Sequence, residues 1–97
     1  MSLLRRAAKR DQAEPDIVQA LEKAGARVER LSAEGLPDLL VFYAQRMYLI
    51  EAKTGTRKVR KSQVKQAEFL AWAHRNGYRV GVCRTPEDAL EFVGAIH

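Results

Sequence analysis

The chain has 97 residues, 46% of them hydrophobic, and a formal net charge of +5. A chain of this length forms one domain, and its single cysteine excludes an internal disulfide. No stretch approaches the roughly 20 apolar residues of a membrane span, and no long apolar run follows the basic start, as it would in a secretory signal. We therefore expect one cytoplasmic domain over residues 1–97, with a basic N-terminal arm over residues 1–12 and no membrane partner.

Hydrophobic periodicity and turn-forming residues predict three helices and four strands in the order αβββαβα. The helices are expected over residues 14–24, 63–76 and 85–93. The strands are expected over residues 26–31, 38–43, 47–53 and 78–83. This order is typical of an α/β fold in which helices flank a mixed sheet.

Local signals support these elements. Pro15 suits the first turn of the first helix, and Gly25 suits its C-terminal end. The strand over residues 26–31 carries charged residues on one face. Only residues 44–46 connect the next two strands, so these strands are expected to form an antiparallel hairpin. The residues expected along one side of the second helix are Val64, Ala67, Leu70, Ala71 and His74.

Three residues with reactive side chains converge at the open end of the predicted hairpin. Glu51 and Lys53 are two residues apart in one strand, so their side chains point to the same face. Asp38 begins the neighbouring strand, and the turn folds it back toward Glu51. The alternative is a turn aspartate beside an exposed strand pair. The residues before Glu51 are apolar on both faces, however, which predicts a central strand.

This combination suits the hydrolysis of a phosphodiester bond. Two carboxylates bind a hard divalent cation through oxygen, and the backbone carbonyl of Ala52 can add a third ligand. Such a cation polarises a phosphate and lowers the pKa of a bound water molecule. Lys53 can orient that water or stabilise negative charge on the phosphate in the transition state. We expect no organic cofactor.

A run of basic residues follows the strand that carries Glu51. Its members are Arg57, Lys58, Arg60, Lys61 and Lys65. Placed there, these side chains are suited to contact DNA phosphates beside the scissile bond, although a solvated charged surface is the alternative. Because no base-reading motif is apparent, recognition is expected to use the shape and the backbone of the DNA.

Four elements of the sequence together resemble the virus-type replication-repair nuclease domain (VRR-NUC), a branch of the PD-(D/E)xK superfamily. They are Glu14, Gly-Leu-Pro-Asp ending at Asp38, Glu-Ala-Lys ending at Lys53, and Gln66. The resemblance extends to about Leu90 and so covers most of the chain. It implies a restriction-endonuclease-like αβββαβ core, in which a mixed sheet is flanked by helices.

The resemblance also implies roles for individual residues. Asp38 and Glu51 are expected to bind Mg²⁺ or Mn²⁺, and Lys53 is expected to be catalytic. Glu14 on the first helix is expected at the metal site, as a ligand or behind the ligands, although it could be only a favourable charge at a helix N-terminus. Gln66 is expected to complete the catalytic set, with Gln63 as its competitor.

The resulting expectation is a metal-dependent, structure-selective DNA endonuclease. Family members that consist of this domain alone resemble Holliday-junction resolvases and act as homodimers, so branched DNA is the expected substrate. Apolar residues of the last helix are candidates for the dimer surface: Leu90, Phe92 and Val93. A sequence-specific, restriction-like nuclease is one alternative. A non-catalytic DNA-binding protein that keeps the fold is another.

Overall fold

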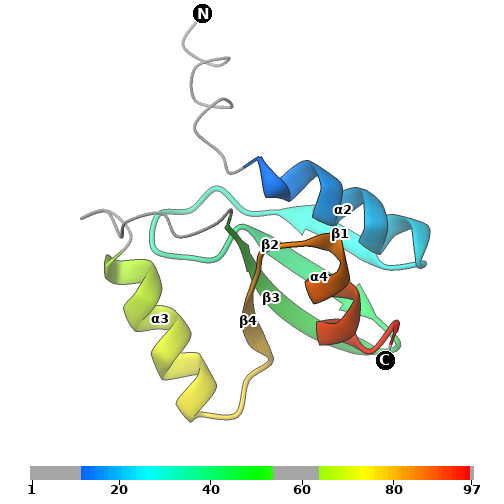
Figure 1. Ribbon diagram of the computed structural model, residues 1–97. Helices are drawn as coiled ribbons and strands as arrows, with labels where there is room; N and C mark the ends of the chain where they lie inside the picture. The colour runs from blue at the N-terminus through cyan, green and yellow to red at the C-terminus, as the bar shows by residue number, and fades with distance from the viewer. Residues whose placement is uncertain (1–11, 54–63, 97) are drawn as a thin grey trace, which may run out of the picture.

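The computed structural model of the protein describes residues 12–53 and 64–96. Within these ranges the chain forms three helices and four strands in the predicted order (Figure 1). The helices are α2 (Ala13–Lys23), α3 (Val64–Arg75) and α4 (Pro86–Val93). The strands are β1 (Arg27–Arg30), β2 (Leu39–Tyr43), β3 (Arg46–Ala52) and β4 (Val80–Cys83). None of these helices is long and apolar enough to cross a membrane.

The four described strands form one mixed sheet in the order β1-β2-β3-β4. The β1–β2 and β2–β3 pairs are antiparallel, whereas β3 and β4 run parallel with α3 as the crossover. β3 therefore lies between two partners, as the apolar sequence before Glu51 predicted. The predicted hairpin turns through only two residues, Ala44 and Gln45, with φ of 51° and 67°. Positive φ at two successive positions matches the twist of the flanking strands in a tight turn.

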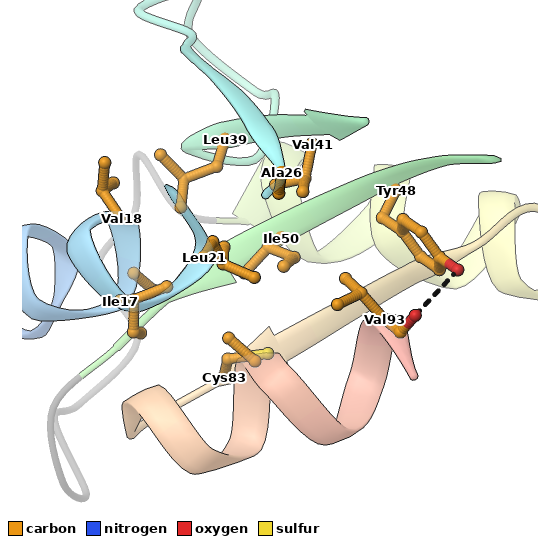
Figure 2. Packing of buried hydrophobic residues seen from close by; sticks show 12 residues of the cluster. Ile17, Val18, Leu21, Ala26, Leu39, Val41, Tyr48, Ile50, Cys83 and Val93 are labelled. Carbon is orange, nitrogen blue, oxygen red and sulfur yellow. Dashed lines mark hydrogen bonds between the residues drawn. The ribbon is translucent and has the colours of Figure 1, made fainter. Parts of the chain in front are cut away.

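The hydrophobic core lies between one face of the sheet and the helices α2 and α4 (Figure 2). Ile17 and Leu21 of α2 are fully buried there against Leu39 and Ile50 of the sheet. Cys83 at the end of β4 is buried in the same core. The alternation of β3, with Ile50 and Ala52 inward, turns Glu51 to the opposite face.

α4 is part of this core, which corrects the candidate dimer surface. Val93 is buried, and Leu90 and Phe92 pack partly buried against the core. Phe92 meets the ring of Tyr48 edge to face at 5.5 Å, and the Tyr48 hydroxyl donates a hydrogen bond to the carbonyl of Val93. The three apolar residues that seemed available for a partner are therefore used inside the chain.

α3 lies on the other side of the sheet and packs mainly against β4 (Figure 1). Its inward side carries the buried Ala73 and the partly buried Gln66, Phe69 and Leu70. The predicted apolar side was wrong for all of its members except Leu70, and those exposed members are Val64, Ala67, Ala71 and His74. The apolar residues of this helix lie on several sides, so spacing alone did not identify the buried one.

Candidate active site

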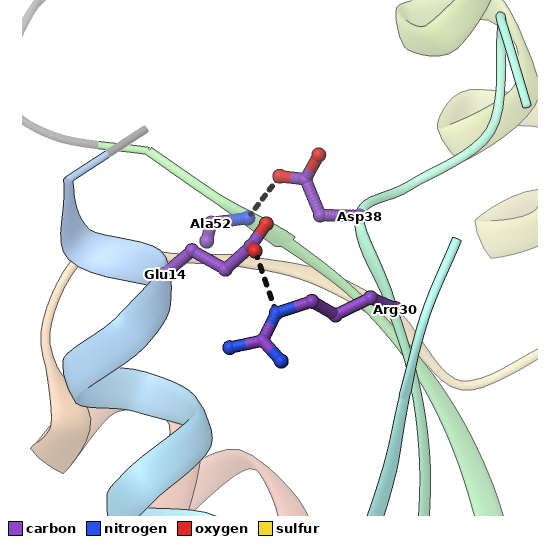
Figure 3. A network of polar contacts seen from close by, with 4 residues as sticks. All are labelled: Glu14, Arg30, Asp38 and Ala52. Atoms are coloured by element: carbon purple, nitrogen blue, oxygen red, sulfur yellow. Dashed lines mark hydrogen bonds and ion pairs between the residues drawn. The ribbon is translucent and has the colours of Figure 1, made fainter. Parts of the chain in front are cut away.

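The two predicted catalytic carboxylates meet where β3 ends and β2 begins. Asp38 directly precedes β2, and the pairing of Leu39 with Ile50 places it across from the end of β3. One carboxylate oxygen of Asp38 accepts a hydrogen bond of 3.1 Å from the backbone N–H of Ala52 (Figure 3). This bond fixes the Asp38 side chain on the strand that carries Glu51.

Glu51 is a buried carboxyl group with only 4% of its surface exposed. The Gln66 side-chain amide donates a hydrogen bond of 2.7 Å to Glu51 Oε1. The same amide nitrogen donates a bond of 3.0 Å to the carbonyl of Leu36, in the loop that leads to Asp38. Gln66 thus joins α3 to both carboxylate-bearing segments. Gln63, its competitor in the sequence, lies outside the described residues.

Burial and a neighbouring charge make Glu51 hard to ionise. Burial is the largest cause, and the charge and side-chain hydrogen bond of Asp38 act with it to raise the pKa of Glu51 from its usual 4.5 to about 8. The ammonium group of Lys53 acts on this pKa in the opposite direction. Two carboxyl groups that share one small volume in this way attract a cation, because a positive ion removes their mutual repulsion.

Lys53 follows β3 directly and is half-buried. Its backbone N–H donates a hydrogen bond of 3.1 Å to the carbonyl of Cys83, which extends the parallel β3–β4 pairing by one residue. The Lys53 ammonium group is near enough to Glu51 to favour the ionised form of its carboxyl group. Asp38, Glu51, Lys53 and Gln66 are therefore gathered at one end of the sheet.

Glu14 has a different partner. Its carboxylate, 3% exposed, accepts a hydrogen bond of 3.0 Å from Arg30 Nε (Figure 3). Among the described residues, no three Asp, Glu, His or Cys side chains are grouped as a metal site. The structure thus brings Asp38 and Glu51 together and pairs Glu14 with Arg30, and the predicted role of Glu14 at the metal site stays a prediction. Sequence reasoning missed Arg30, whose only signal was a charged residue in a short strand.

One of the five predicted DNA-contacting residues falls within the part of the chain that the structure describes. Arg57, Lys58, Arg60 and Lys61 lie outside the described residues. Lys65 is exposed in the first turn of α3, beside Gln66. A Cβ at Gly35 would lie 3.4 Å from the Lys65 Cβ, so Lys65 packs closely on the loop that leads to Asp38. One predicted basic residue is therefore next to the site.

The carboxylate oxygens of this site are suitable ligands for a hard divalent cation. Carboxylate oxygens are the ligands that Mg²⁺ and Mn²⁺ prefer, and Mg²⁺ is commonly bound by one or two protein carboxylates with water and phosphate completing its shell. Asp38 and Glu51 supply such a pair. No thiolate or imidazole lies among the residues gathered here, so the site does not resemble a zinc site.

Comparison with known proteins shows which known fold this chain adopts. No family model matches the sequence, and no curated protein matches it either. Among solved structures, one described as "VRR_NUC domain" is similar, with a TM-score of 0.63 and 22% sequence identity. The likeness covers 89% of this chain and 95% of that chain. The protein therefore has the fold of a VRR_NUC domain, which confirms the predicted fold class and agrees with the resemblance seen in the sequence.

Proposed function

We propose that this protein is a metal-dependent nuclease of the VRR-NUC type that hydrolyses phosphodiester bonds in DNA. The observation that carries the proposal is the buried Glu51, held by Gln66 and adjacent to Asp38, at the end of a central strand. A buried carboxyl group beside a second carboxyl group is costly to maintain, and such groups are concentrated at functional sites. The fold of a VRR_NUC domain supports the same conclusion.

Each residue of the set has a task in this reaction. Asp38 and Glu51 would hold Mg²⁺ or Mn²⁺, with the Ala52 carbonyl as a further ligand. When bound, the cation supplies Lewis acidity toward the phosphate and lowers the pKa of a water molecule. Lys53 stabilises the negative charge that develops on the phosphate. Gln66 fixes the orientation of the Glu51 carboxylate through its hydrogen bond of 2.7 Å.

Branched DNA, such as a Holliday junction, is the proposed substrate, and a homodimer is the proposed active form. The net charge of +5 suits a polyanion, and the basic residues from Arg57 to Lys65 follow the catalytic strand directly. Two copies related by a two-fold axis would present two sites to two strands of a junction.

A cleavage assay tests the proposal. Labelled duplex, single strand, splayed arm and four-way junction are incubated with Mg²⁺, with Mn²⁺ or with a chelator. Cleavage should require the metal, should be greatest for the junction, and should fall about 100- to 1000-fold in Lys53→Ala, because charge stabilisation in the transition state has effects of this size. Lys23→Ala, which removes an exposed lysine from the last turn of α2, is the matched control.

Three results would contradict this proposal. Cleavage at one short duplex sequence would favour the restriction-like alternative. Binding of DNA without cleavage by any folded preparation would favour the non-catalytic protein. Equal cleavage by Lys53→Ala and the parent would place the reaction at another site. Circular dichroism and sedimentation show in each case whether the variant is folded and dimeric.

A further inference from the structure

The ion pair between Glu14 and Arg30 joins the first turn of α2 to the last residue of β1. The two partners differ sharply in exposure, because the Glu14 side chain is 3% exposed and the Arg30 side chain is 53% exposed. A carboxylate buried to this extent needs a partner of opposite charge or a hydrogen-bond donor. Glu14 is thus an anchor within the protein, and Arg30 is held by it at the surface.

The pair engages one side of the Arg30 guanidinium group, and more than half of the Arg30 side chain is exposed. The contact to Glu14 Oε2 is made by Arg30 Nε, at 3.0 Å. Figure 3 shows the two terminal nitrogens of Arg30 on the side of the guanidinium away from Glu14. These nitrogens form the fork that binds two oxygens of one phosphate, and an arginine held in place binds with a smaller loss of side-chain freedom.

Arg30 lies at the same end of the sheet as the carboxylates. It pairs with Leu39, the residue that follows Asp38. Its neighbour Leu31 donates a backbone hydrogen bond of 2.7 Å to the carbonyl of Asp38. Asp38 in turn accepts the hydrogen bond from Ala52 at the end of β3. An unbroken series of contacts therefore connects Arg30 to the residues proposed to hold the metal.

We propose that Arg30 binds a phosphate of the DNA strand beside the cleavage site, and that Glu14 is the residue that positions it. This role rests on the DNA-cleaving function proposed above. It gives Glu14 a task that does not require direct contact with the metal, in agreement with the pairing seen in the structure.

Arg27 is a matched control in the same strand. It also pairs with a glutamate, Glu29, but both side chains are exposed, at 78% and 47%. Arg27 lies at the other end of β1, where it pairs with Phe42 near the hairpin turn and away from Asp38. Substituting either arginine by alanine removes one positive charge. General attraction to DNA therefore predicts equal effects of the two substitutions, whereas a specific contact predicts an effect of Arg30 alone.

The experiment measures the affinity of the full chain for a fluorescent DNA duplex by anisotropy, in Ca²⁺ or a chelator so that cleavage is not required. Arg30→Ala should weaken binding about 10-fold, the effect of one charged hydrogen-bonded contact, and should reduce the slope of log affinity against log salt by about 0.9. Arg27→Ala should leave both quantities nearly unchanged. Arg30→Lys should restore the slope but only part of the affinity, because it keeps the charge and loses the fork.

Glu14→Gln separates positioning from charge. It keeps the size of the side chain and leaves every positive charge in place, so simple electrostatics predicts tighter DNA binding. Positioning predicts weaker binding, because Arg30 loses its anchor, and no additional loss when Glu14→Gln is combined with Arg30→Ala. Thermal melting of each variant confirms that it is folded at the assay temperature.

Single methylphosphonate substitutions in the DNA identify the contacted phosphate. One neutral linkage near the cut position should weaken binding of the parent protein and have no effect on Arg30→Ala. Equal behaviour of Arg30→Ala and Arg27→Ala, or tighter binding by Glu14→Gln, would overturn the role of Arg30 while cleavage by the parent still supported the nuclease. Failure of the parent protein to bind any DNA would overturn both proposals.

Discussion

Glu51 and Asp38 place two carboxyl groups in one small volume, and Glu51 is almost completely shielded from water. The burial is a consequence of strand alternation, since Glu51 occupies an inward position against α3 while its neighbours fill the core on the other face. Without a cation the pair therefore retains a proton over much of the neutral pH range. The folded state and the unfolded state consequently bind different numbers of protons.

This difference predicts a pH dependence of stability. The folded pKa of Glu51 is about 8 and its ordinary value is 4.5, so between these limits the folded chain keeps a proton that the unfolded chain has released. Stability from this group is complete below pH 4.5 and is lost as the pH rises to 8. Glu51→Gln removes the effect. In a chelator, the melting temperature of Glu51→Gln minus that of the parent should increase from pH 5 to about 8.

Glu22→Gln, at an exposed position of α2, is the control for the loss of one glutamate. A difference in melting temperature between Glu51→Gln and the parent that stays constant over this pH range would contradict the raised pKa. Added Mg²⁺ should stabilise the parent more than Glu51→Gln, because the cation binds the ionised carboxyl group and replaces the proton.

Residue by residue, the site was predictable only where a strand pattern accompanied it. The spacing of Glu51 and Lys53, and the hairpin that returns Asp38, followed from strand alternation and a short turn. Gln66 was predicted from the family resemblance, since nothing in the neighbouring sequence distinguishes it from an exposed helix residue. Arg30 was not found, because its partner Glu14 lies 16 residues away in another element.

The close contact between β4 and α4 predicts that a larger residue in β4 will destabilise the protein. A Cβ at Gly81 would lie 3.0 Å from two ring carbons of Phe92. Gly81→Ala should therefore lower the free energy of unfolding by about 1–3 kcal/mol, as overpacked cores do. Val82→Thr, a change at the neighbouring exposed position, should alter it by about 0.5 kcal/mol or less. Urea unfolding measures both.

Phe92→Leu provides the complementary check on this contact. In the Gly81→Ala background it should recover part of the missing stability, because a shorter side chain makes room for the new methyl group. Equal stabilities of Gly81→Ala and Val82→Thr would show instead that the Phe92 ring moves aside without cost.

Elements were predicted with errors of one or two residues at their ends, and the reasons are local. β4 begins at Val80 and not at Tyr78, because Tyr78 is 60% exposed and stacks on the ring of Trp72 at 5.6 Å. The buried side of α3 was misassigned, because Ala73 is its buried residue and apolar residues such as Trp72 stay exposed. Sequence periodicity identifies a helix but does not show how completely a sheet will cover it.

For the whole molecule, the positive charge of the chain predicts a strong salt dependence of DNA binding. Substituting Arg57, Lys58 and Lys61 together by glutamine should reduce the slope of log affinity against log salt by about 0.9 for each DNA phosphate that the variant no longer neutralises. The control substitutes the exposed residues Arg46, Arg75 and Arg79, which changes the net charge equally. Equal reductions of the slope in the two triple variants would show that only the total charge matters.

The mixed sheet was predictable for the whole molecule, whereas the assembly was not. Four strands, a hairpin and a helical crossover leave few ways to arrange a sheet in so short a chain. A dimer surface has no periodic signal, and the apolar residues that suggested one on the last helix pack in the core. The association of two copies therefore stays a prediction of the family resemblance.

The order of the strands also bears on how the molecule folds. β1, β2 and β3 are neighbours in both sequence and space, so they can pair through short loops, whereas β4 joins β3 only after the chain has passed through α3. Local pairings form faster than those that close a long loop. On this basis, Asp38 and Glu51 meet in the early hairpin, and the amide of Gln66 reaches Glu51 only when the crossover docks. We therefore expect the carboxylate pair to be assembled before α3 packs over it.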